Sequence, residues 1–520
     1  MSLPPPDPSL RASVVVPAKD EENLVGHCLR SLAEQAGMAP EEYEVLLVLD
    51  RCTDATAERS LEVTSDYPGL RLAFLEGPGI GAGHARRVGM EAACERLISL
   101  ARPGALIAST DADTVVAPDW LARQLAAVEA GARAVGGRIE LSTEGDALPE
   151  GIRSWRDRRG QERRLGLLES GKGSRAEHWQ FSGASMSLTA EAYREVGGLQ
   201  PRAALEDEYL EHALERCGIP IERPLDVRVT TSPRLVGRAS RGLAKDLSLA
   251  SWLQSNTYRK PPRTPVPAGS AGVSVIVPVR GDEETPPPPE LGRVALIRTP
   301  THGSDVPLTE EFGPVRGRGD ALWRGLSEAE GELVVLLSEL SREALAAVPA
   351  LLAPLLEREE LALVKGYPAG GSPSEASRLI GTPLINLHHP ELAGFVDPLS
   401  PFVAARRELL ASLPFPVGAG VDASLLLDAA NSRGVWATAQ AALPVRPTPA
   451  SSEDAHAVMA ALLSRAREAV EPLPSPAPLV IPDPAGTGFD TRRVQVEERP
   501  PLERLAVPAT GQRRSQRSGG

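Results

Sequence analysis

The sequence lacks the features that would place it in a membrane or on an export route. No apolar run approaches the ~20 residues that a membrane-spanning helix needs. The first nine residues, MSLPPPDPS, contain neither the basic region nor the apolar region of a signal peptide. We therefore expect a cytoplasmic protein with no transmembrane segment.

Cysteine is also scarce, and negative charge outnumbers positive charge. The four cysteines, Cys28, Cys52, Cys94 and Cys217, are scattered without a CxxC pair, which argues against a zinc site and fits a reducing compartment. Lysine and arginine number 56 against 69 aspartate and glutamate residues, so the net charge is −13. Such an acidic balance disfavours nucleic acid, and we expect no nucleic-acid partner.

Strand and helix patterns alternate through the first part of the chain. Apolar runs typical of strands are found at 13–17, 45–49, 70–75 and 105–110. A helical pattern follows the first run, and a glycine-rich loop at 77–83 precedes the last. This alternation predicts an α/β fold with a mostly parallel sheet, whose ligand crevice lies beyond the carboxyl ends of the strands. A chain of 520 residues is too long for one compact core, so two domains or more are expected.

Two carboxylates follow the last of these strands. Asp111 and Asp113 stand one residue apart, and Asp50 ends the strand at 45–49. Hard oxygen ligands suit Mg²⁺ or Mn²⁺, which in turn prefer phosphate oxygens as their remaining ligands. The pair therefore suggests a nucleotide-diphosphate substrate, although a plain turn is the alternative for any isolated Asp-x-Asp.

Four motifs in a fixed order resemble the nucleotide-binding half of a family 2 glycosyltransferase with the GT-A fold: VVVPAKDEEN, the strand ending VLD, GAGHARRVG and TDADT. Three later motifs, SGASMSL, AYREVGGL and LEDE, resemble the acceptor half. Together they cover about residues 12–235. The resemblance implies a nucleotide-diphosphate sugar as donor, most commonly a UDP-sugar, and an acceptor that the sequence does not identify.

The resemblance also implies roles for individual residues. The residues it places around the nucleotide sugar are Pro17, Ala18, Lys19, Glu21, Asp50, Arg86, Asp111 and Ala112. Arg86 would lie near the diphosphate or the base, and Asp111 near the ribose. Asp113, together with Asp111, would hold the metal, and Asp207 matches the catalytic base. The family usually carries an aromatic residue or asparagine where this chain has Lys19, so the nucleotide stays open.

Glu206 and Asp207 carry the candidate chemistry. Asp207 would accept the proton of an acceptor hydroxyl as that hydroxyl attacks the anomeric carbon from the opposite face, which inverts its configuration. Glu206 would orient Asp207 or raise its pKa by like-charge repulsion. The alternative is an acidic first helical turn that complements the helix dipole.

The pattern starts over in the second half of the chain. Ser274–Pro278 repeats Ser13–Pro17 after a proline-rich stretch. GRGDALWRGL, LALVKGY and ELLASLPFPVGAGVD resemble the glucosyl-3-phosphoglycerate synthases, a retaining GT-A family. Where those enzymes carry Asp-Ser-Asp, this chain reads Ser338-Glu339-Leu340, and Arg318 replaces the loop lysine. We therefore expect the second copy to be degenerate.

The predicted organisation has two tandem GT-A domains. It comprises an active domain at 12–258, a linker at 259–272, a degenerate domain at 273–470 and a disordered tail at 471–520. The favoured function is an inverting, metal-dependent glycosyltransferase. A bifunctional transferase, whose second domain acts on a phosphoglycerate-like acceptor, and a non-catalytic sugar-nucleotide scaffold are the alternatives. The oligomeric state stays open, a homodimer included.

Overall fold

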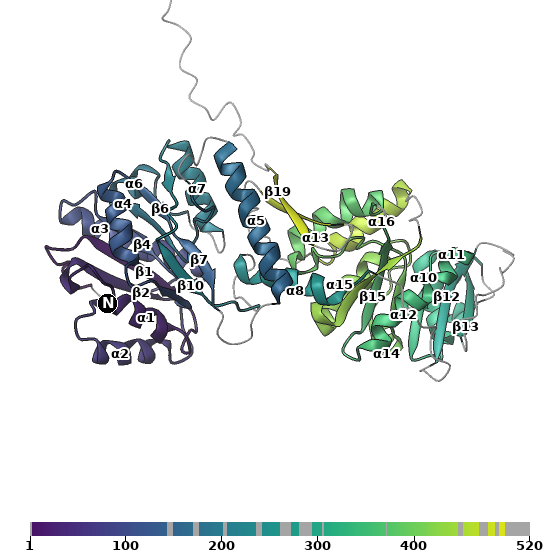
Figure 1. Cartoon of the computed structure of the whole chain (residues 1–520). Coiled ribbons are helices and arrows are strands. Elements are labelled where there is room, and N and C mark those ends of the chain that lie inside the picture. Colours follow the sequence, from purple (N-terminus) through teal and green to yellow (C-terminus); the bar gives the residue numbers. More distant parts are fainter. Residues whose placement is uncertain are drawn as a thin grey trace, which may run out of the picture. The chain divides into compact units, whose positions relative to one another are not determined.

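The computed structural model divides into two compact units, Met1–Ser255 and Asn256–Gly520 (Figure 1). The residues that it describes are 3–142, 149–169, 176–200, 205–235, 242–259, 272–279, 294–303, 306–370, 372–445, 451–466, 477–483 and 488–494. Each unit contains a sheet of seven strands. The predicted α/β fold with a mostly parallel sheet is confirmed in the first unit.

The central sheet of the first unit has the strand order β3-β2-β1-β4-β8-β6-β9. Its strands are β1 (Ala12–Ala18), β2 (Tyr43–Leu49), β3 (Leu72–Glu76), β4 (Leu106–Ser109), β6 (Ala134–Gly136), β8 (Met186–Thr189) and β9 (Ile221–Glu222). The strand β8 runs antiparallel to both of its neighbours, whereas the pairs of β1 with β2 and β4 are parallel. Because helices cover both faces, β1 is buried along its whole length, which explains its continuous apolar run.

Helices form a layer on each face of this sheet. The helical segments that begin in this unit are α1 (Val25–Ala33), the 3₁₀ turn η1 (Pro40–Glu42), α2 (Thr56–Asp66), α3 (Ala82–Ser99), α4 (Trp120–Glu129), α5 (Glu150–Glu169), α6 (Ala190–Glu195), α7 (Glu206–Arg216) and α8 (Leu243–Asn256). One core cluster joins α1, α2 and α4 to Val14 and Val16. The other joins α3, α6 and α7 to Val15. The alternating side chains of β1 therefore anchor both layers.

A second, three-stranded sheet lies at the end of β4. It contains β5 (Thr114–Val116), β10 (Arg228–Thr231) and β7 (Arg138–Leu141), in the order β5-β10-β7. The strand β10 pairs antiparallel with β5, so that Thr231 lies opposite Thr114. This pairing brings the chain beyond residue 231 beside the Asp-x-Asp segment.

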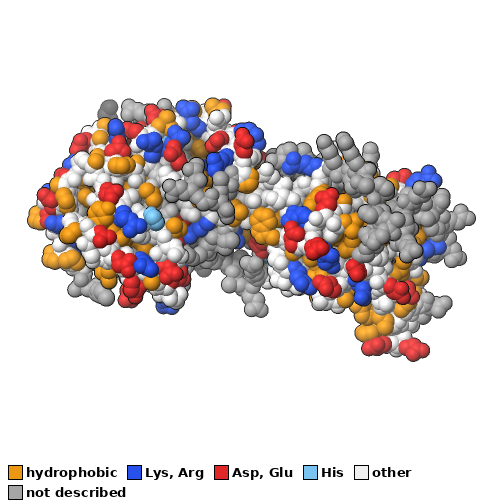
Figure 2. Space-filling view, turned by 60° about the horizontal axis from the view of Figure 1, so that its bottom comes forward, with side chains coloured by type: hydrophobic (Ala, Val, Ile, Leu, Met, Phe, Trp, Pro, Cys, Tyr) orange, Lys and Arg blue, Asp and Glu red, His pale blue; other side chains and the backbone are white. Residues whose placement is uncertain are grey.

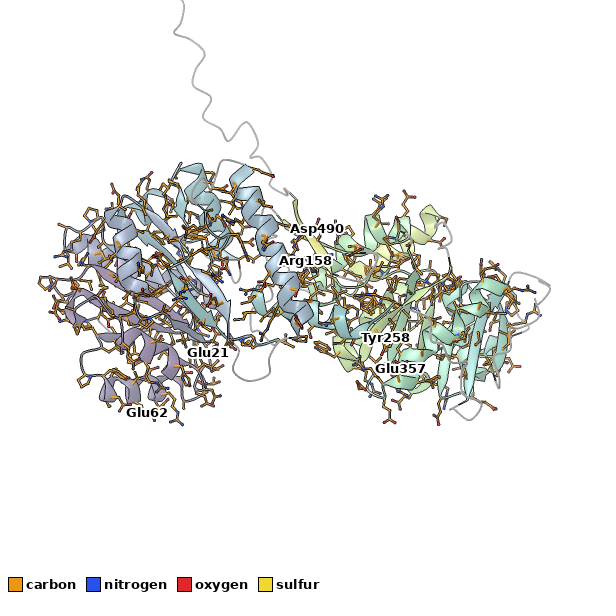
Figure 3. All side chains as sticks on the ribbon, viewed as in Figure 1. Glu21, Glu62, Arg158, Tyr258, Glu357 and Asp490 are labelled. Carbon is orange, nitrogen blue, oxygen red and sulfur yellow. The ribbon has the colours of Figure 1, made fainter. Side chains whose placement is uncertain are left out.

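The sheet of the second unit has the order β11-β17-β15-β16-β14-β12-β13. Its strands are β11 (Thr257–Tyr258), β12 (Val273–Val279), β13 (Val294–Pro300), β14 (Leu333–Leu336), β15 (Leu363–Pro368), β16 (Val403–Arg406) and β17 (Thr438–Leu443). As in the first sheet, one antiparallel strand, β16, separates two parallel sets. Tyr258, labelled in Figure 3, pairs through β11 with β17, so the second unit begins before the predicted end of the first domain at 258.

The helical segments of the second unit are α9 (Thr309–Phe312), α10 (Arg318–Glu328), α11 (Arg342–Ala346), α12 (Val348–Glu357), the π-helix η2 (Ser377–Gly381), α13 (Thr382–His388), η3 (Pro390–Leu392), α14 (Arg407–Ser412), α15 (Val421–Arg433), η4 (Val435–Ala437) and α16 (Ser452–Leu463). Most of the predicted linker, 260–271, lies outside the described residues.

The predicted disorder from residue 471 onward is wrong for part of that segment. The strands β18 (Ala477–Pro482) and β19 (Phe489–Val494) form an antiparallel hairpin. Asn386 of α13 accepts a hydrogen bond from the N–H of Val480 and donates one to its carbonyl, at 2.8 and 3.0 Å. The abundance of proline and arginine predicted disorder, but two short runs that pair with each other satisfy their own backbone groups.

The surface carries charges of both signs, and the cysteines are unpaired. Figure 2 shows acidic and basic side chains interspersed over the visible face of both units. All four cysteines are free thiols. Within the part of the chain that the structure describes, no helix combines the length and the apolar character needed to cross a bilayer.

Candidate functional site

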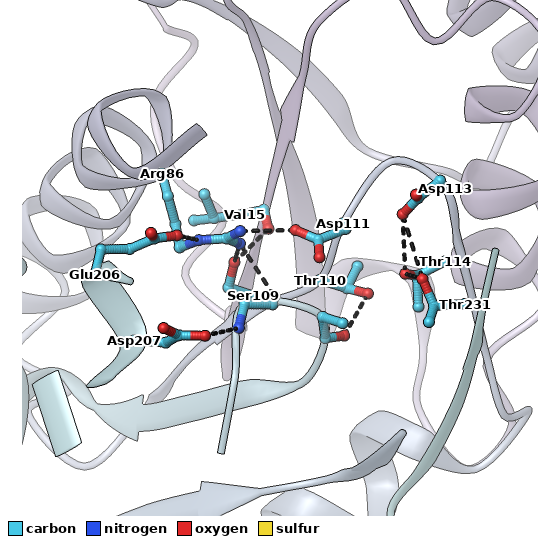
Figure 4. A network of polar contacts seen from close by, with 12 residues as sticks. Val15, Arg86, Ser109, Thr110, Asp111, Asp113, Thr114, Glu206, Asp207 and Thr231 are labelled. Carbon is cyan, nitrogen blue, oxygen red and sulfur yellow. Dashed lines mark hydrogen bonds and ion pairs between the residues drawn. The ribbon is translucent and has the colours of Figure 1, made fainter. Parts of the chain in front are cut away.

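Five of the predicted site residues lie around the carboxyl end of β4, namely Arg86, Asp111, Asp113, Glu206 and Asp207 (Figure 4). Asp111 turns toward α3, where its Oδ1 lies 2.7 Å from Nη2 of Arg86. Asp113 turns the other way, and its Oδ1 lies 3.4 Å from the hydroxyls of both Thr114 and Thr231. The two carboxylates of the Asp-x-Asp segment therefore face different partners.

Arg86 links the end of β4 to the start of α7 and to the loop that contains Gly183. Its side chain is only 3% exposed and lies 3.0 Å from Glu206 through Nε. Its Nη1 donates to the hydroxyl of Ser109 at 2.6 Å and to the carbonyl of Gly183 at 3.1 Å. A Cβ at position 183 would lie 2.4 Å from the guanidinium, so the glycine of the SGA motif makes room for this arginine. Protein groups therefore hold Arg86 on every side.

Asp207 lies in the first turn of α7, next to this network. Its carboxylate accepts hydrogen bonds from the N–H of Gly183 at 3.2 Å and from that of Glu208 at 2.9 Å. Burial, followed by repulsion from Glu206 and Glu208, raises the pKa of Asp207 to about 8. Leu205, immediately before the helix, has a φ of 61°, a conformation that costs free energy for a leucine. A carboxylate with a raised pKa close to a strained backbone position is typical of catalytic acids and bases.

Asp113 also has a second contact that the sequence analysis missed. Arg234 follows β10 and places Nη2 3.0 Å from Oδ2 of Asp113. Its Nη1 lies 2.8 Å from Oε1 of Glu21. Burial and the charge of Asp111 still raise the pKa of Asp113 to about 6, with Arg234 acting in the opposite direction. The sequence analysis predicts no strand at 228–231, so it offers no signal for this contact.

The remaining predicted nucleotide contacts are spread along the same sheet edge. Pro17 and Ala18 are the last residues of β1 and are buried, as is Ala112. The side chain of Lys19 is half-exposed, lies 3.3 Å from Asp20 and donates to the carbonyl of Arg51. No contact of the structure tests the roles predicted for these residues.

Asp50 is engaged by the glycine-rich loop. Its carboxylate accepts hydrogen bonds from the N–H groups of Gly79 and Gly81. Both glycines have positive φ angles, 80° and 119°, which a side chain would oppose. At Gly77 a Cβ would lie 2.6 Å from Asp50 Oδ1. The glycine content of this loop is therefore explained by its packing around Asp50.

The residues at the end of β4 fit a divalent metal ion. The cluster contains five carboxylates and two guanidinium groups, namely Glu21, Asp111, Asp113, Glu206, Asp207, Arg86 and Arg234. Asp113 is only 9% exposed, and a carboxylate at this depth requires a cation, which Arg234 supplies in this structure. Oxygen donors of this kind are the ligands that Mg²⁺ and Mn²⁺ prefer.

A parallel-rich α/β sheet with this acidic cluster at the carboxyl ends of its strands fits the class of nucleotide-sugar-dependent glycosyltransferases. The sequence profile of Glycosyl transferase family 2 matches residues 13–183. A relative from Mycolicibacterium paratuberculosis, a glucosyl-3-phosphoglycerate synthase, is 31% identical over 290 residues, which cover 46% of this chain and 87% of the relative. The chain belongs to glycosyltransferase family 2.

Further relatives carry the same name. The glucosyl-3-phosphoglycerate synthase of Mycobacterium tuberculosis is 38% identical over 174 residues, which cover 29% of this chain and 53% of that protein. A crystal structure of the M. tuberculosis enzyme matches with a TM-score of 0.34 and 31% identity, over 48% of this chain and 98% of the other. Another, in complex with Mn²⁺ and UDP-glucose, matches with a TM-score of 0.35 and 28% identity, over the same shares.

Proposed function

We propose that the first unit transfers a sugar from a nucleotide-diphosphate donor to an acceptor hydroxyl with inversion, and that Asp207 is the base. The observation that carries this proposal is the carboxylate of Asp207, which lies beside the Arg86 network and has a raised pKa. Asp207 accepts the hydroxyl proton as the acceptor oxygen attacks the anomeric carbon. General-base catalysis of this kind is typically worth about 100- to 10,000-fold.

Asp111 and Asp113 are the proposed ligands of Mg²⁺ or Mn²⁺. A metal ion bound there would neutralise the charge that develops on the departing diphosphate. Arg86 pairs with both Asp111 and Glu206, so it connects the proposed metal ligands to the helix start that carries Asp207. Pro17, Ala18, Lys19, Glu21, Asp50 and Ala112 are the proposed surroundings of the nucleotide.

The names of the relatives suggest the two substrates. Glucosyl-3-phosphoglycerate synthases join glucose to 3-phosphoglycerate, and one of them is covered over 87% of its length. We therefore propose a UDP-glucose-type donor and a small phosphorylated acceptor such as 3-phosphoglycerate. The proposed inversion differs from the retention that the resemblance to those synthases implies; it rests on Asp207, and the anomeric configuration of the product tests it. A cytoplasmic location and a homodimer stay predictions.

The second unit is proposed to be a second GT-A domain without transfer activity. The pairing Val15↔Ser109 in the first sheet corresponds to Ile276↔Leu336 in the second. Two and four residues beyond these strand residues stand Asp111 and Asp113 in the first unit, but Ser338 and Leu340 in the second. The equivalent strand end thus offers no carboxylate fork. A bifunctional enzyme would need its metal ligands from elsewhere.

Thermal melting of the full chain with UDP-, GDP- and ADP-sugars, each with and without Mn²⁺, tests the proposal. A donor at about 100 times its dissociation constant should stabilise the first unit by roughly 2.7 kcal/mol. Asp113→Ala should remove the metal-dependent shift, whereas Glu339→Gln, the matched change at the second strand end, should retain it. A metal-dependent shift that survives Asp113→Ala would contradict the proposed site, and no shift with any donor would contradict both the transferase and the sugar-nucleotide scaffold.

A further inference from the structure

Arg234 occupies the side of Asp113 that a metal ion would need. It contacts Oδ2 of Asp113 at 3.0 Å and Oε1 of Glu21 at 2.8 Å with the two ends of one guanidinium group. The other carboxylate oxygen of Asp113 lies against two threonine hydroxyls. The cation that Asp113 requires is thus supplied by the protein itself in this structure.

The placement of Arg234 follows from strand pairing. Thr231, the last residue of β10, lies opposite Thr114, which adjoins Asp113. The hydroxyl of Thr114 donates to that of Thr231 at 2.9 Å, which fixes the two strands at this point. Arg234 follows three residues later. Arg234 lies in the segment after β10, so the pairing of β10 with β5 brings it to the carboxylates.

Arg234 and Arg86 differ in exposure and in the number of their protein partners. Arg86 is 3% exposed and is engaged by Asp111, Glu206, Ser109 and Gly183. Arg234 is 33% exposed, and its partners are the two carboxylates. A guanidinium group matches a phosphate as well as a carboxylate, because both accept two parallel N–H bonds. Arg234 is therefore the arginine of this cluster that can change partners.

We infer that Arg234 is a donor-binding residue that exchanges partners: it neutralises Asp113 and Glu21 in the empty site and turns to the donor diphosphate when a divalent cation takes those carboxylates. This inference rests on the proposed metal site. It has two consequences of opposite sign. Arg234 competes with the metal ion when no nucleotide is present, and it strengthens the binding of a nucleoside diphosphate when the metal ion is bound.

Mn²⁺ and UDP binding to the full chain measure the two consequences separately. Free Mn²⁺ is followed by electron paramagnetic resonance, and UDP binding at saturating Mn²⁺ by calorimetry. The variants are Arg234→Gln, Asp113→Asn and, as a matched control from the same segment, the exposed Arg228→Gln. Arg234→Gln should bind Mn²⁺ roughly tenfold more tightly than the wild type and UDP roughly tenfold more weakly. Arg228→Gln should match the wild type in both.

Each result has a distinct meaning. If Arg234→Gln binds Mn²⁺ with unchanged or weaker affinity, Arg234 does not compete with the metal ion. If Arg234→Gln binds UDP with unchanged affinity, Arg234 does not turn to the diphosphate. Asp113→Asn should abolish the Mn²⁺ binding of both the wild type and the Arg234→Gln background. If Mn²⁺ binding instead survives Asp113→Asn in both backgrounds, the proposed metal site is wrong, and the inference is overturned with it.

Discussion

The two units place an arginine and an acidic helix start at the same sheet edge, but they connect them differently. Gly89 of α3 packs against Val15, and Gly325 of α10 packs against Ile276, which is the equivalent strand residue. Counting back from these glycines, Arg86 corresponds to Leu322, and Arg318 corresponds to Ala82. The arginine has therefore moved by one helical turn between the units.

This shift changes the environment of one carboxylate, which is the second residue of α7 in the first unit and of α15 in the second. Asp207 in α7 and Asp422 in α15 occupy that position. Arg318 donates directly to Asp422, whereas Arg86 donates to Glu206 and Asp111 and leaves Asp207 to backbone N–H groups. A shared fold can therefore preserve the position of a carboxylate without preserving its chemistry, because the protonation of the carboxylate depends on which residue the nearby arginine pairs with.

The largest expected effect is on turnover. Asp207→Asn should lower the rate of sugar transfer from UDP-glucose at least about 100-fold, because the amide cannot accept the hydroxyl proton. UDP binding should persist. Asp422→Asn, the matched change in the second unit, should alter the rate less than about twofold. Transfer to 3-phosphoglycerate, measured below the melting temperature of each variant, checks both. A comparable loss in Asp422→Asn would show that the second unit takes part in the reaction.

The next effect concerns stability. Arg86→Met leaves Asp111 and Glu206 without their cation, and the loss of one partner of a buried ion pair costs about 3–5 kcal/mol. Arg318→Met should cost less, about 1–2 kcal/mol, because its side chain is 20% exposed and pairs with one carboxylate. Hydrogen–deuterium exchange of peptides containing β4 and β14 reports each unit separately. If the two variants lose equal stability, the deeper burial of Arg86 does not make its ion pairs more important than that of Arg318.

A smaller effect depends on pH. Because the pKa of Asp207 is raised to about 8, its protonated form favours the folded state, and that stability is lost as the pH rises through about 8. Asp207→Asn should therefore melt a few degrees above the wild type at about pH 9, and the difference should vanish toward about pH 4. Asp422→Asn, which breaks an ion pair, should instead melt below the wild type at about pH 9. A pH-independent difference for Asp207→Asn would contradict the raised pKa.

The smallest effect concerns the hairpin β18–β19, which is found in the second unit. Asn386→Ala removes both side-chain hydrogen bonds to Val480 and should cost about 1 kcal/mol or slightly more. Limited proteolysis should then cut the chain near β18 faster than in the wild type. Asn256→Ala, which removes hydrogen bonds to the carbonyls of Trp436 and Thr438 elsewhere in the same unit, serves as a comparison and should leave cleavage near β18 unchanged.

Local patterns predicted the elements of the first unit better than its long-range contacts. The alternation of apolar runs located β1, β2 and β4, and polar residues at the strand ends predicted a site at their edge. The structure joins Asp111 and Glu206 through Arg86, as expected of residues from one site. Their roles in binding and catalysis remain predictions.

Arg234 and the hairpin β18–β19 could not be predicted in the same way. Arg234 reaches Asp113 because β10 pairs with β5, and that pairing joins residues more than 100 positions apart. The hairpin forms between two short runs in a segment whose composition predicted disorder. In both cases the deciding contacts are made between strands, where a single-sequence pattern carries little information.

The engagement of Asp50 by the glycine-rich loop has a consequence for ligand selection. Two of the loop N–H groups already bond to a carboxylate, so a phosphate group would have to displace an anion in order to use them. The start of α3 thus repels the ligand that many glycine-rich loops attract. In the proposed site we therefore expect the loop to keep the charged end of a nucleotide away from the end of β2, which leaves the end of β4 for the diphosphate.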